Sequence, residues 1–427
     1  MNIRQILKNR TVNNAGWLIA GRVAQMVINL IIGLLTARYL GPSNFGVINY
    51  ATAYTTFFAA FCTLGINSVL VKEFIDKPGE EGSIIGTSLG LRAISSFLSV
   101  IVIISIVSII DSSEPQTVIA VALSGIGVLF QIFEVINYWF QSRLKSKVVA
   151  ISSFIAYFIV AVYKTVLILL HKDVTYFAAA TAIDYFFLGL LLLFAYKKNG
   201  GKRLSFSKKY GKELLNKSRH FILPSLMVAI YGQTDRIMLK HMISTAEIGY
   251  YSTAVSVSNM WCFVLSAIID SCYPSIMQAY NTSKAVYVKR NKQLYAIIFY
   301  MSLVVSILFT LLGKLIIGIM YGQAYLPAVA PLRIVTWYTA FSYLGVARNA
   351  WIVCENRQKY LIYIYISSAV ANVILNILFI PRWGATGAAV ASLIAQIMTT
   401  MIVPFFIKGL RENSKMMVEA IMLKGCR

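Results

Sequence analysis

The sequence predicts an all-α integral membrane protein of about twelve transmembrane helices, arranged as two parallel six-helix lobes around a central cavity. Three observations predict this class: the composition, the distribution of basic residues and a weak internal repeat. Of the 427 residues, 58% are hydrophobic and only 13% are charged, and the mean hydropathy is +0.71. Ordinary soluble domains are about 45–50% apolar and about 25% charged. The composition therefore disfavours a soluble enzyme, a disordered protein and a nucleic-acid-binding domain.

Twelve apolar segments are long enough to cross a bilayer, which takes about 20 residues. We expect them at residues 14–38, 45–70, 84–110, 116–140, 148–170, 174–196, 220–242, 246–272, 293–319, 327–353, 359–380 and 384–407. Most connectors are short, so neighbouring helices should be antiparallel. The longest hydrophilic stretch is basic and separates the sixth span from the seventh. We therefore expect an N-terminal lobe at residues 1–196, a basic cytoplasmic linker at 197–219 and a C-terminal lobe with its tail at 220–427.

Basic residues indicate the orientation. If the N-terminus is cytoplasmic, the segments on that side carry 28 Lys and Arg residues, whereas the opposite side carries only Arg38, Lys172 and Arg382. Cytoplasmic loops are enriched in Lys and Arg, so both termini are expected in the cytoplasm. The net charge of +23 then marks loops facing anionic headgroups, and no nucleic-acid partner is expected.

An internal repeat appears when the sequence is shifted by 203 residues, which places Gly46 over Gly249. Polar residues of the second and eighth spans then correspond: Asn49, Thr56, Thr63 and Asn67 with Ser252, Asn259, Ser266 and Asp270. Their spacings predict one polar face on each helix. Six spans per half make the repeats parallel, as in transporters with a cavity between two halves. The alternative is chance matching of small polar residues, which are common in packed membrane helices.

Four basic residues within the spans are candidate substrate-binding groups of a cationic cavity: Arg22, Arg92, Arg236 and Lys240. A charge at membrane depth costs at least about 2.5–3.5 kcal/mol. Arg22 and Arg236 lie on polar helix faces, where an aqueous cavity is the expected surrounding. Arg92 has apolar sequence neighbours and needs a partner from the protein or from water.

Uncharged polar residues and one carboxylate are expected to line the same cavity: Gln25, Asn29, Asn49, Thr56, Asn67, Asp235 and Asn259. The alternative for these positions is hydrogen bonding between helices of a dry bundle.

Asp184 lies near the middle of the sixth span, and Lys164 lies at a similar depth on the fifth. A structural ion pair is the favoured interpretation. The sharper alternative is that Asp184 couples transport to protons or sodium ions. Glu134 shares a face of the fourth span with Gln131, Asn137 and Gln141, and that face either extends the cavity or contacts a neighbouring helix.

No catalytic or metal-binding pattern accompanies these residues. The sequence has no Walker loop, no HExxH and no GxSxG. Its three histidines and five cysteines have no metal-ligand spacing. We therefore expect no enzyme activity, no cofactor and no metal site, and an ion gradient, the membrane potential or the substrate's own gradient as the energy source.

Two motifs resemble those of a known family. Residues 35–46 (LTARYLGPSNFG) and 384–391 (GATGAAVA) are similar to signatures of Wzx-type flippases, in the polysaccharide branch of the multidrug/oligosaccharidyl-lipid/polysaccharide exporter superfamily. The resemblance covers essentially the whole chain. It implies a multi-pass protein of the bacterial inner membrane that moves an undecaprenyl-diphosphate-linked oligosaccharide to the outer leaflet by alternating access. Such transport serves O-antigen, capsule or exopolysaccharide synthesis, with membrane lipids and a polysaccharide polymerase as further partners.

The charges fit that role, because a diphosphate and a sugar chain need a polar, cationic passage, and an arginine fork suits a diphosphate. Two alternatives remain open. An ion-coupled multidrug antiporter of the same superfamily would favour acidic and aromatic groups in its cavity. A membrane glycosyl polymerase or ligase would carry a large charged outer loop, whereas the outer loops here are short.

Overall fold

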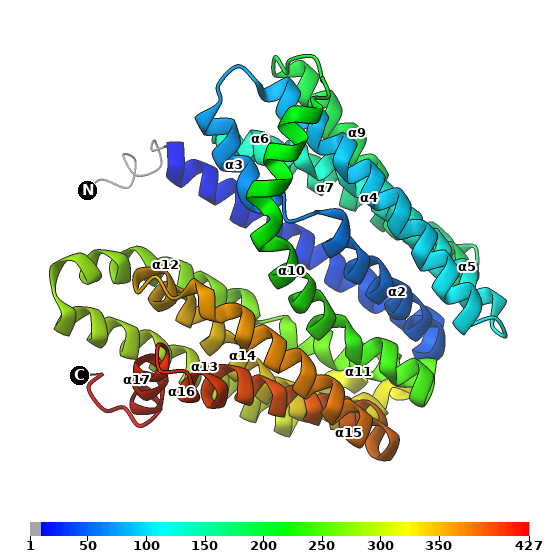
Figure 1. The fold of residues 1–427 in the computed structure, drawn as a ribbon. Coiled ribbons are helices and arrows are strands. Elements are labelled where there is room, and N and C mark those ends of the chain that lie inside the picture. Colours follow the sequence, from blue (N-terminus) through cyan, green and yellow to red (C-terminus); the bar gives the residue numbers. More distant parts are fainter. Residues whose placement is uncertain (1–9, 427) are drawn as a thin grey trace. The chain divides into compact units, whose positions relative to one another are not determined.

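The computed structural model describes residues 10–426, and this part of the chain is helical with no strand (Figure 1). Eight helical stretches in it are long and apolar enough to cross a membrane. The predicted all-α membrane fold is confirmed. Two of the eight, Val23–Cys62 and Gln358–Phe406, each contain two of the predicted spans, because each is bent sharply at a glycine.

Two compact units make up the chain. The N-terminal unit comprises Met1–Leu40 and Val47–Ala229, and the C-terminal unit comprises Gly41–Gly46 and Ile230–Arg427. The boundary near the middle of the sequence falls inside helix α10 (Lys208–Met242), beyond the basic stretch. The first part of α10 therefore belongs to the N-terminal unit and the rest to the C-terminal unit.

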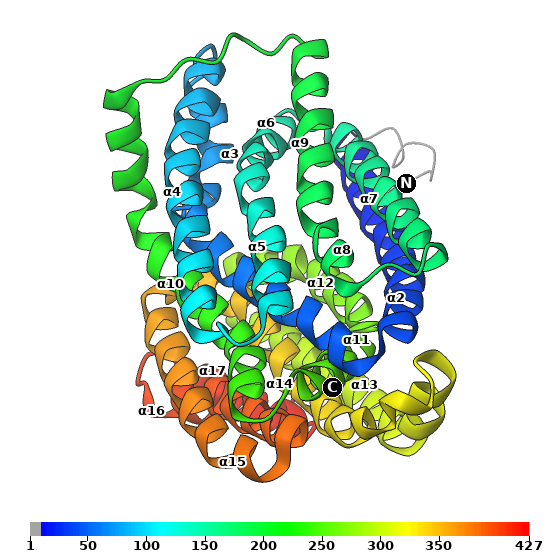
Figure 2. The ribbon, with the colours of Figure 1, turned by 90° about the vertical axis from the view of Figure 1, so that its right-hand side faces the viewer.

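The N-terminal unit is built from long helices joined by short turns. In Figure 2, α4, α5 and α9 run beside one another, and α7 packs on α9. In its core, the rings of Phe140 and Tyr196 pack edge to face with the ring of Trp139. Besides the start of α10, the elements are α2 (Arg10–Cys62), α3 (Asn67–Asp76), α4 (Glu81–Ile110), α5 (Pro115–Phe130), η1 (Gln131–Glu134), α6 (Val135–Ser142), α7 (Ser146–Leu169), α8 (Val174–Ala178) and α9 (Ala180–Lys198).

The C-terminal unit is centred on α13 and α14, which pack against each other along their length. Its core includes Leu294, Tyr295 and Trp351, all almost fully buried. After α10, the elements are α11 (Thr245–Asn259), α12 (Cys262–Thr282), α13 (Lys284–Met320), η2 (Gln323–Ala328), α14 (Val329–Cys354), η3 (Gln358–Tyr360), α15 (Leu361–Ile397), η4 (Met398–Ile402), α16 (Val403–Phe406) and α17 (Arg411–Ile421).

The two motif segments owe their glycines to backbone geometry. Gly41 has φ 71° and precedes Pro42 at the bend of α2, and only glycine adopts this conformation without strain. Gly384 has φ 52° at the bend of α15, three residues after Pro381. The carboxylate of Glu247 accepts a hydrogen bond from the backbone N–H of Ala385 at 2.5 Å, which satisfies a donor at the start of the following helical segment. Both motifs therefore mark tight reversals between helices.

The continuous polar faces predicted for the second and eighth spans are wrong. The helix of the second span ends at Cys62, and a turn with positive φ at Leu64 and Gly65 separates it from α3. The eighth span is divided between α11 and α12 by a break at residues 260–261. A break of this kind rotates the face, so the predicted polar residues do not line one straight helix.

Candidate functional site

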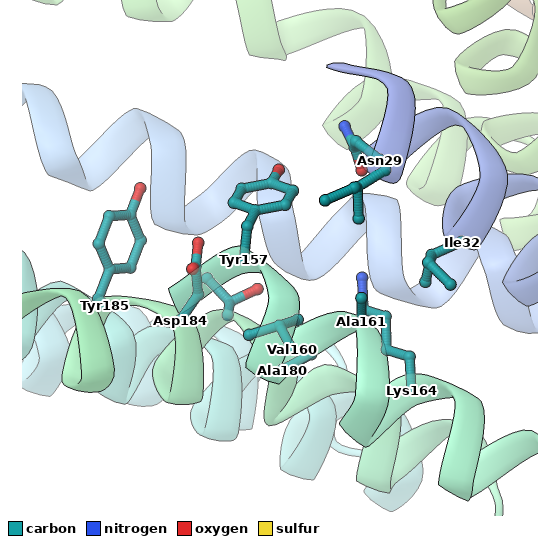
Figure 3. Close-up of a pocket in the computed structure, with 11 residues that line it drawn as sticks. Asn29, Ile32, Tyr157, Val160, Ala161, Lys164, Ala180, Asp184 and Tyr185 are labelled. Atoms are coloured by element: carbon teal, nitrogen blue, oxygen red, sulfur yellow. The ribbon is translucent and has the colours of Figure 1, made fainter. Parts of the chain in front are cut away.

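A polar cavity of about 140 Å³ lies within the N-terminal unit, between α2, α7 and α9 (Figure 3). It offers space for roughly four or five water molecules. Asn29 lines it from α2, Tyr157 and Lys164 from α7, and Asp184 and Tyr185 from α9. In Figure 3 the carboxylate of Asp184 and the ammonium group of Lys164 both point toward the cavity. Charges of both signs therefore face one small polar space.

Lys164 and Asp184 are not in direct contact. Among the described residues the two form no ion pair within 4.0 Å, although they line the same cavity. The structural pair favoured from the sequence therefore stays a prediction, since the two charges share one small cavity without touching.

Arg92 of α4 lies inside the N-terminal unit with no exposed surface. Its Nη1 donates to Oδ1 of Asn67 at 3.4 Å, and its Nη2 lies 4.0 Å from Oε2 of Glu134. Arg92, whose sequence neighbours are apolar, is expected from the sequence to need a partner. The acidic partner is Glu134, from the short 3-10 turn η1. Arg92 lines neither of the two polar cavities described here.

A second polar cavity, of about 390 Å³, lies within the C-terminal unit. It is lined from α10 by Tyr231, Asp235 and Arg236, and from α14 by Tyr338. Asn259, at the end of α11, also faces it. Arg236, one of the predicted cationic residues, therefore has its side chain against this cavity.

Hydrogen bonds fix the guanidinium of Arg236 and leave part of it open. Its Nε donates to the hydroxyl of Ser252 at 3.0 Å, and its Nη1 donates to Oε1 of Gln233 at 2.8 Å. Nη1 also lies 3.4 Å from the carbonyl of Gly232. Within the described part of the chain, Nη2 has no partner, and the side chain is only half-buried. A preorganised cation with one free nitrogen therefore faces the cavity.

Asp235 is buried beside Arg236, and its carboxylate accepts hydrogen bonds from side chains of two other helices of the C-terminal unit. Its Oδ1 accepts hydrogen bonds from the amides of Asn376 at 2.7 Å and Asn372 at 3.1 Å. Its Oδ2 accepts from the hydroxyls of Ser392 at 2.6 Å and Tyr251. Four uncharged donors from α11 and α15 therefore surround one carboxylate. This group of five residues is called the Asp235 cluster below.

The remaining predicted residues are dispersed. Arg22 lies on α2, but its side chain is outside the described residues. Gln25 and Asn49 are half-buried and Thr56 is exposed, all on α2. Lys240 is almost fully buried near the end of α10 and does not line the C-terminal cavity. The structure thus brings together Asn29, Lys164 and Asp184 in one unit, and Asp235, Arg236 and Asn259 in the other.

The tyrosines of both cavities and the amides of α15 were not predicted from the sequence. Tyr157, Tyr185, Tyr231 and Tyr338 all line a cavity. Asn372 and Asn376 are spaced by four on an apolar span, so both lie on one helix face. That spacing was the available signal for the Asp235 cluster.

The described residues hold no group of three or more His, Cys, Asp or Glu side chains suited to a metal ion. The C-terminal cavity combines a free guanidinium donor with tyrosines, which can bind an oxyanion and contact sugar rings.

Comparison with known proteins finds similarity to polysaccharide biosynthesis proteins. A family model described as "Polysaccharide biosynthesis protein" matches residues 11–280 of the chain. The capsular polysaccharide biosynthesis protein CapF of Staphylococcus aureus is 21% identical over 409 residues, covering 93% of this chain and 99% of that protein. The probable flippase AglR of Haloferax volcanii is 26% identical over 194 residues, covering 43% of this chain and 40% of that protein.

Solved structures are similar over nearly the whole chain. The lipid II flippase MurJ, in an inward closed conformation, matches with a TM-score of 0.69 at 14% identity, over 96% of this chain and 91% of that one. An inward-facing multidrug resistance MATE family transporter of the MOP superfamily matches with a TM-score of 0.69 at 14% identity, over 92% and 96%. At this identity the similarity establishes the fold alone.

Proposed function

Because this chain belongs to the polysaccharide biosynthesis protein family, whose model matches residues 11–280, we propose that it is a flippase for a lipid-linked oligosaccharide. The resemblance drawn from the two glycine motifs is confirmed by this membership. The cargo in the proposal is an oligosaccharide repeat unit on undecaprenyl diphosphate, moved from the cytoplasmic to the outer leaflet of the inner membrane. The product would supply a surface polysaccharide such as O-antigen, capsule or exopolysaccharide.

The observation that carries the proposal is the half-buried Arg236 in the C-terminal cavity. A lipid-linked sugar presents a diphosphate, whose transfer through hydrocarbon without compensating hydrogen bonds is costly. Arg236 offers a fixed positive charge with Nη2 free to bind a phosphate oxygen. Tyr231 and Tyr338 in the same cavity offer rings and hydroxyls for sugars. Arg22 and Lys240 are further cationic candidates in this proposal.

Transport in this proposal follows alternating access between an N-terminal and a C-terminal six-helix lobe, with both termini in the cytoplasm. The asymmetry of basic residues, 28 on one side and 3 on the other, supports the orientation. Gly41 and Gly384, which mark the helix reversals, would lie at the opposite membrane surface. The multidrug antiporter alternative is less well supported, because the C-terminal cavity carries a free arginine rather than free carboxylates.

A coupling cation is best accommodated by the Asp235 cluster, and we include sodium binding there in the proposal. The cluster combines a carboxylate with amide and hydroxyl oxygens, which are ligands that hard cations prefer. Oδ1 of Asn376 is buried and has no hydrogen-bond partner among the described residues. Rotating the two amides by half a turn would direct both amide oxygens at the site. Asp184, beside the polar cavity of the N-terminal unit, remains the candidate for proton coupling.

The experiment that tests the flippase function is complementation. A host lacking its own flippase for a known lipid-linked repeat unit should regain surface polysaccharide when this protein is expressed with the matching sugar transferases. Lipid-linked repeat units should then stop accumulating in the inner leaflet. Continued accumulation in the presence of membrane-inserted protein would contradict the proposal for that cargo.

Sodium coupling needs a separate test. The purified protein should unfold at a higher temperature in sodium chloride than in potassium chloride at equal ionic strength, since a ligand that binds the folded state stabilises it. Asp235→Asn should abolish this difference, whereas Asp184→Asn should retain it. Equal unfolding temperatures in the two salts would remove sodium from the proposal and leave the flippase function untouched.

A further inference from the structure

The extended segment 199–207, between α9 and α10, is held along the first turns of α4 and is called the strap here. Its backbone N–H at Ser205 donates to the carbonyl of Gly82 at 3.2 Å, and the hydroxyls of Ser205 and Ser83 lie 2.8 Å apart. The N–H of Ser207 donates to the hydroxyl of Thr87 at 3.0 Å. These bonds give the basic connector one defined position on the N-terminal unit.

Three glycines of α4 make room for the strap. Gly82, Gly86 and Gly90 are spaced by four and therefore share one helix face. A Cβ atom on Gly82 would overlap the carbonyl of Arg203, and one on Gly86 would overlap the backbone of Ser205. A Cβ atom on Gly90 would lie 2.8 Å from the ring of Phe206. The groove occupied by the strap thus exists only because these side chains are absent.

The outer side of the strap and its two ends carry exposed cations. Lys202 is paired with Glu81 at 3.7 Å. The six other basic residues between 197 and 212 are exposed and form no ion pair with any described residue: Lys197, Lys198, Arg203, Lys208, Lys209 and Lys212. Such a density of uncompensated charge on a fixed backbone favours an anionic ligand.

Apolar side chains of the strap place that ligand at the membrane surface. Leu204 is 43% exposed and Phe206 is 58% exposed. The apolar helix before the strap ends at Lys198, and the apolar helix beside it begins at Glu81. Gly90, under the ring of Phe206, is nine residues into that helix, or about 13 Å along its axis. Phe206 therefore reaches toward the apolar layer while the cations stay at the level of the headgroups.

We propose that the strap, with the ends of α9 and α10, is a binding surface for anionic phospholipid headgroups. The cations contact the lipid phosphates, and Leu204 and Phe206 insert among the acyl chains. Each Lys or Arg near an anionic membrane surface contributes about 1 kcal/mol, which corresponds to roughly five-fold in affinity. This proposal rests on the spans and the strap and is independent of the transported cargo.

The test measures binding of short-chain phosphatidylglycerol and phosphatidylcholine to the full-length protein in detergent, by native mass spectrometry. The wild type should bind phosphatidylglycerol more tightly than phosphatidylcholine. Arg203→Gln, Lys208→Gln, Lys209→Gln together should weaken phosphatidylglycerol binding by roughly 100-fold. A matched control with the same charge change, Lys172→Gln, Lys314→Gln, Arg382→Gln, should bind like the wild type, since these exposed residues lie at the outer ends of the predicted spans.

Two further experiments test whether the position of the strap matters as well as its charge, and whether the ligand is a lipid or free phosphate. Gly86→Ala keeps every charge but displaces the strap, and it should also weaken phosphatidylglycerol binding. Inorganic diphosphate at the same concentration should not displace the bound lipid. Unchanged binding by the triple strap variant, or displacement by diphosphate, would overturn the proposal. Should that variant not fold, wild-type affinity for phosphatidylglycerol must still fall with added salt, and a salt-independent affinity would overturn it equally.

Discussion

Gly46 and Gly249, 203 residues apart in the chain, pack directly against each other. A Cβ atom on Gly46 would lie 3.2 Å from the backbone nitrogen of Gly249, and one on Gly249 would overlap the carbonyl of Pro42. Beside this contact, the hydroxyls of Ser43 and Thr245 are 2.9 Å apart. The separation equals the shift of the sequence repeat, so the contact joins two positions that the repeat superimposes. Only glycine at both positions allows the two backbones to approach so closely.

The Gly46–Gly249 contact should open during transport if it belongs to a gate. Ser43→Cys combined with Thr245→Cys, in a variant without the five native cysteines, should form a disulfide readily, because the two Oγ atoms are already adjacent. The cross-linked protein should lose transport, and reduction should restore it. Each single cysteine variant is the control. Cross-linked protein that transports at the uncross-linked rate would show that this contact stays closed throughout the cycle.

Removing the carboxylate of Asp235 should destabilise the protein. Asp235→Leu would leave four buried donors without their acceptor, and each unsatisfied buried group costs about 1–3 kcal/mol. The variant should unfold well below the wild-type temperature or fail to accumulate in the membrane. Asp270→Leu, at an exposed carboxylate of α12, is the matched control and should change stability by about 0.5 kcal/mol or less. Equal stability of the two variants would argue against the hydrogen-bonded cluster.

Lys164 and Asp184 should be energetically coupled in unfolding experiments, because they face the same small cavity. Lys164→Met, Asp184→Asn and the double variant form a double-mutant cycle. The interaction energy should lie between about 0.5 and 3 kcal/mol, as for groups coupled through a shared cavity. Thermal unfolding in one detergent measures all four proteins. An interaction energy below about 0.3 kcal/mol would show that the two groups are independent and would contradict the structural pair expected from the sequence.

The start of α10 is fastened to α3 by an ion cluster that should persist over a wide pH range. Glu213 accepts hydrogen bonds from Lys217 at 2.8 Å and Lys77 at 2.9 Å, and these lower the pKa of Glu213 to about 2. Hydrogen bonds to Glu213 and Glu73 raise the pKa of Lys217 to about 12. The lowered carboxyl pKa means that this stabilisation is complete above about pH 4.5 and is lost as the pH falls toward 2. The raised lysine pKa means that it is lost again as the pH rises toward 12.

Pepsin digestion between pH 4.5 and pH 2 follows this loss directly. Cleavage within residues 208–220 of the wild type should be slow at pH 4.5 and accelerate toward pH 2. Glu213→Gln removes the shared carboxylate, so its cleavage in the same segment should already be fast at pH 4.5. Glu412→Gln, at an exposed carboxylate of α17, is the matched control for loss of one carboxylate and should be cleaved like the wild type at each pH. Identical profiles for wild type and Glu213→Gln would exclude the cluster as the fastener of α10.

The fold class was predictable because hydrophobicity and basic residues act over whole segments. Helix reversals are also indicated by the sequence itself, at Gly41 before Pro42 and at Gly384 after Pro381. The breaks at residues 63–66 and 260–261 were missed, since the apolar pattern continues across them. Local sequence propensity therefore predicts the presence of a helix more reliably than the position of a bend in it.

Polar and charged residues within the spans could be picked out from the sequence, but their contacts could not. Arg92 signalled its need for a partner, yet its partner Glu134 lies on a 3-10 turn whose direction the sequence does not reveal. Asp235 and Asn376 are 141 residues apart, so only packing brings them together. The strap was expected as a linker, because its three supporting glycines carry no chemical signal of their own.

Flipping of a fluorescent undecaprenyl-diphosphate-linked oligosaccharide in proteoliposomes tests the central proposal, a cationic passage centred on Arg236. Wild-type protein should move the lipid between leaflets, Arg236→Ala should abolish movement while remaining folded in the membrane, and Arg236→Lys should restore part of it, because lysine returns the charge without the fork. Lys314→Ala, at a basic residue of α13 that does not line the C-terminal cavity, should flip like the wild type. Wild-type rates of flipping by well-folded Arg236→Ala would contradict the proposed passage.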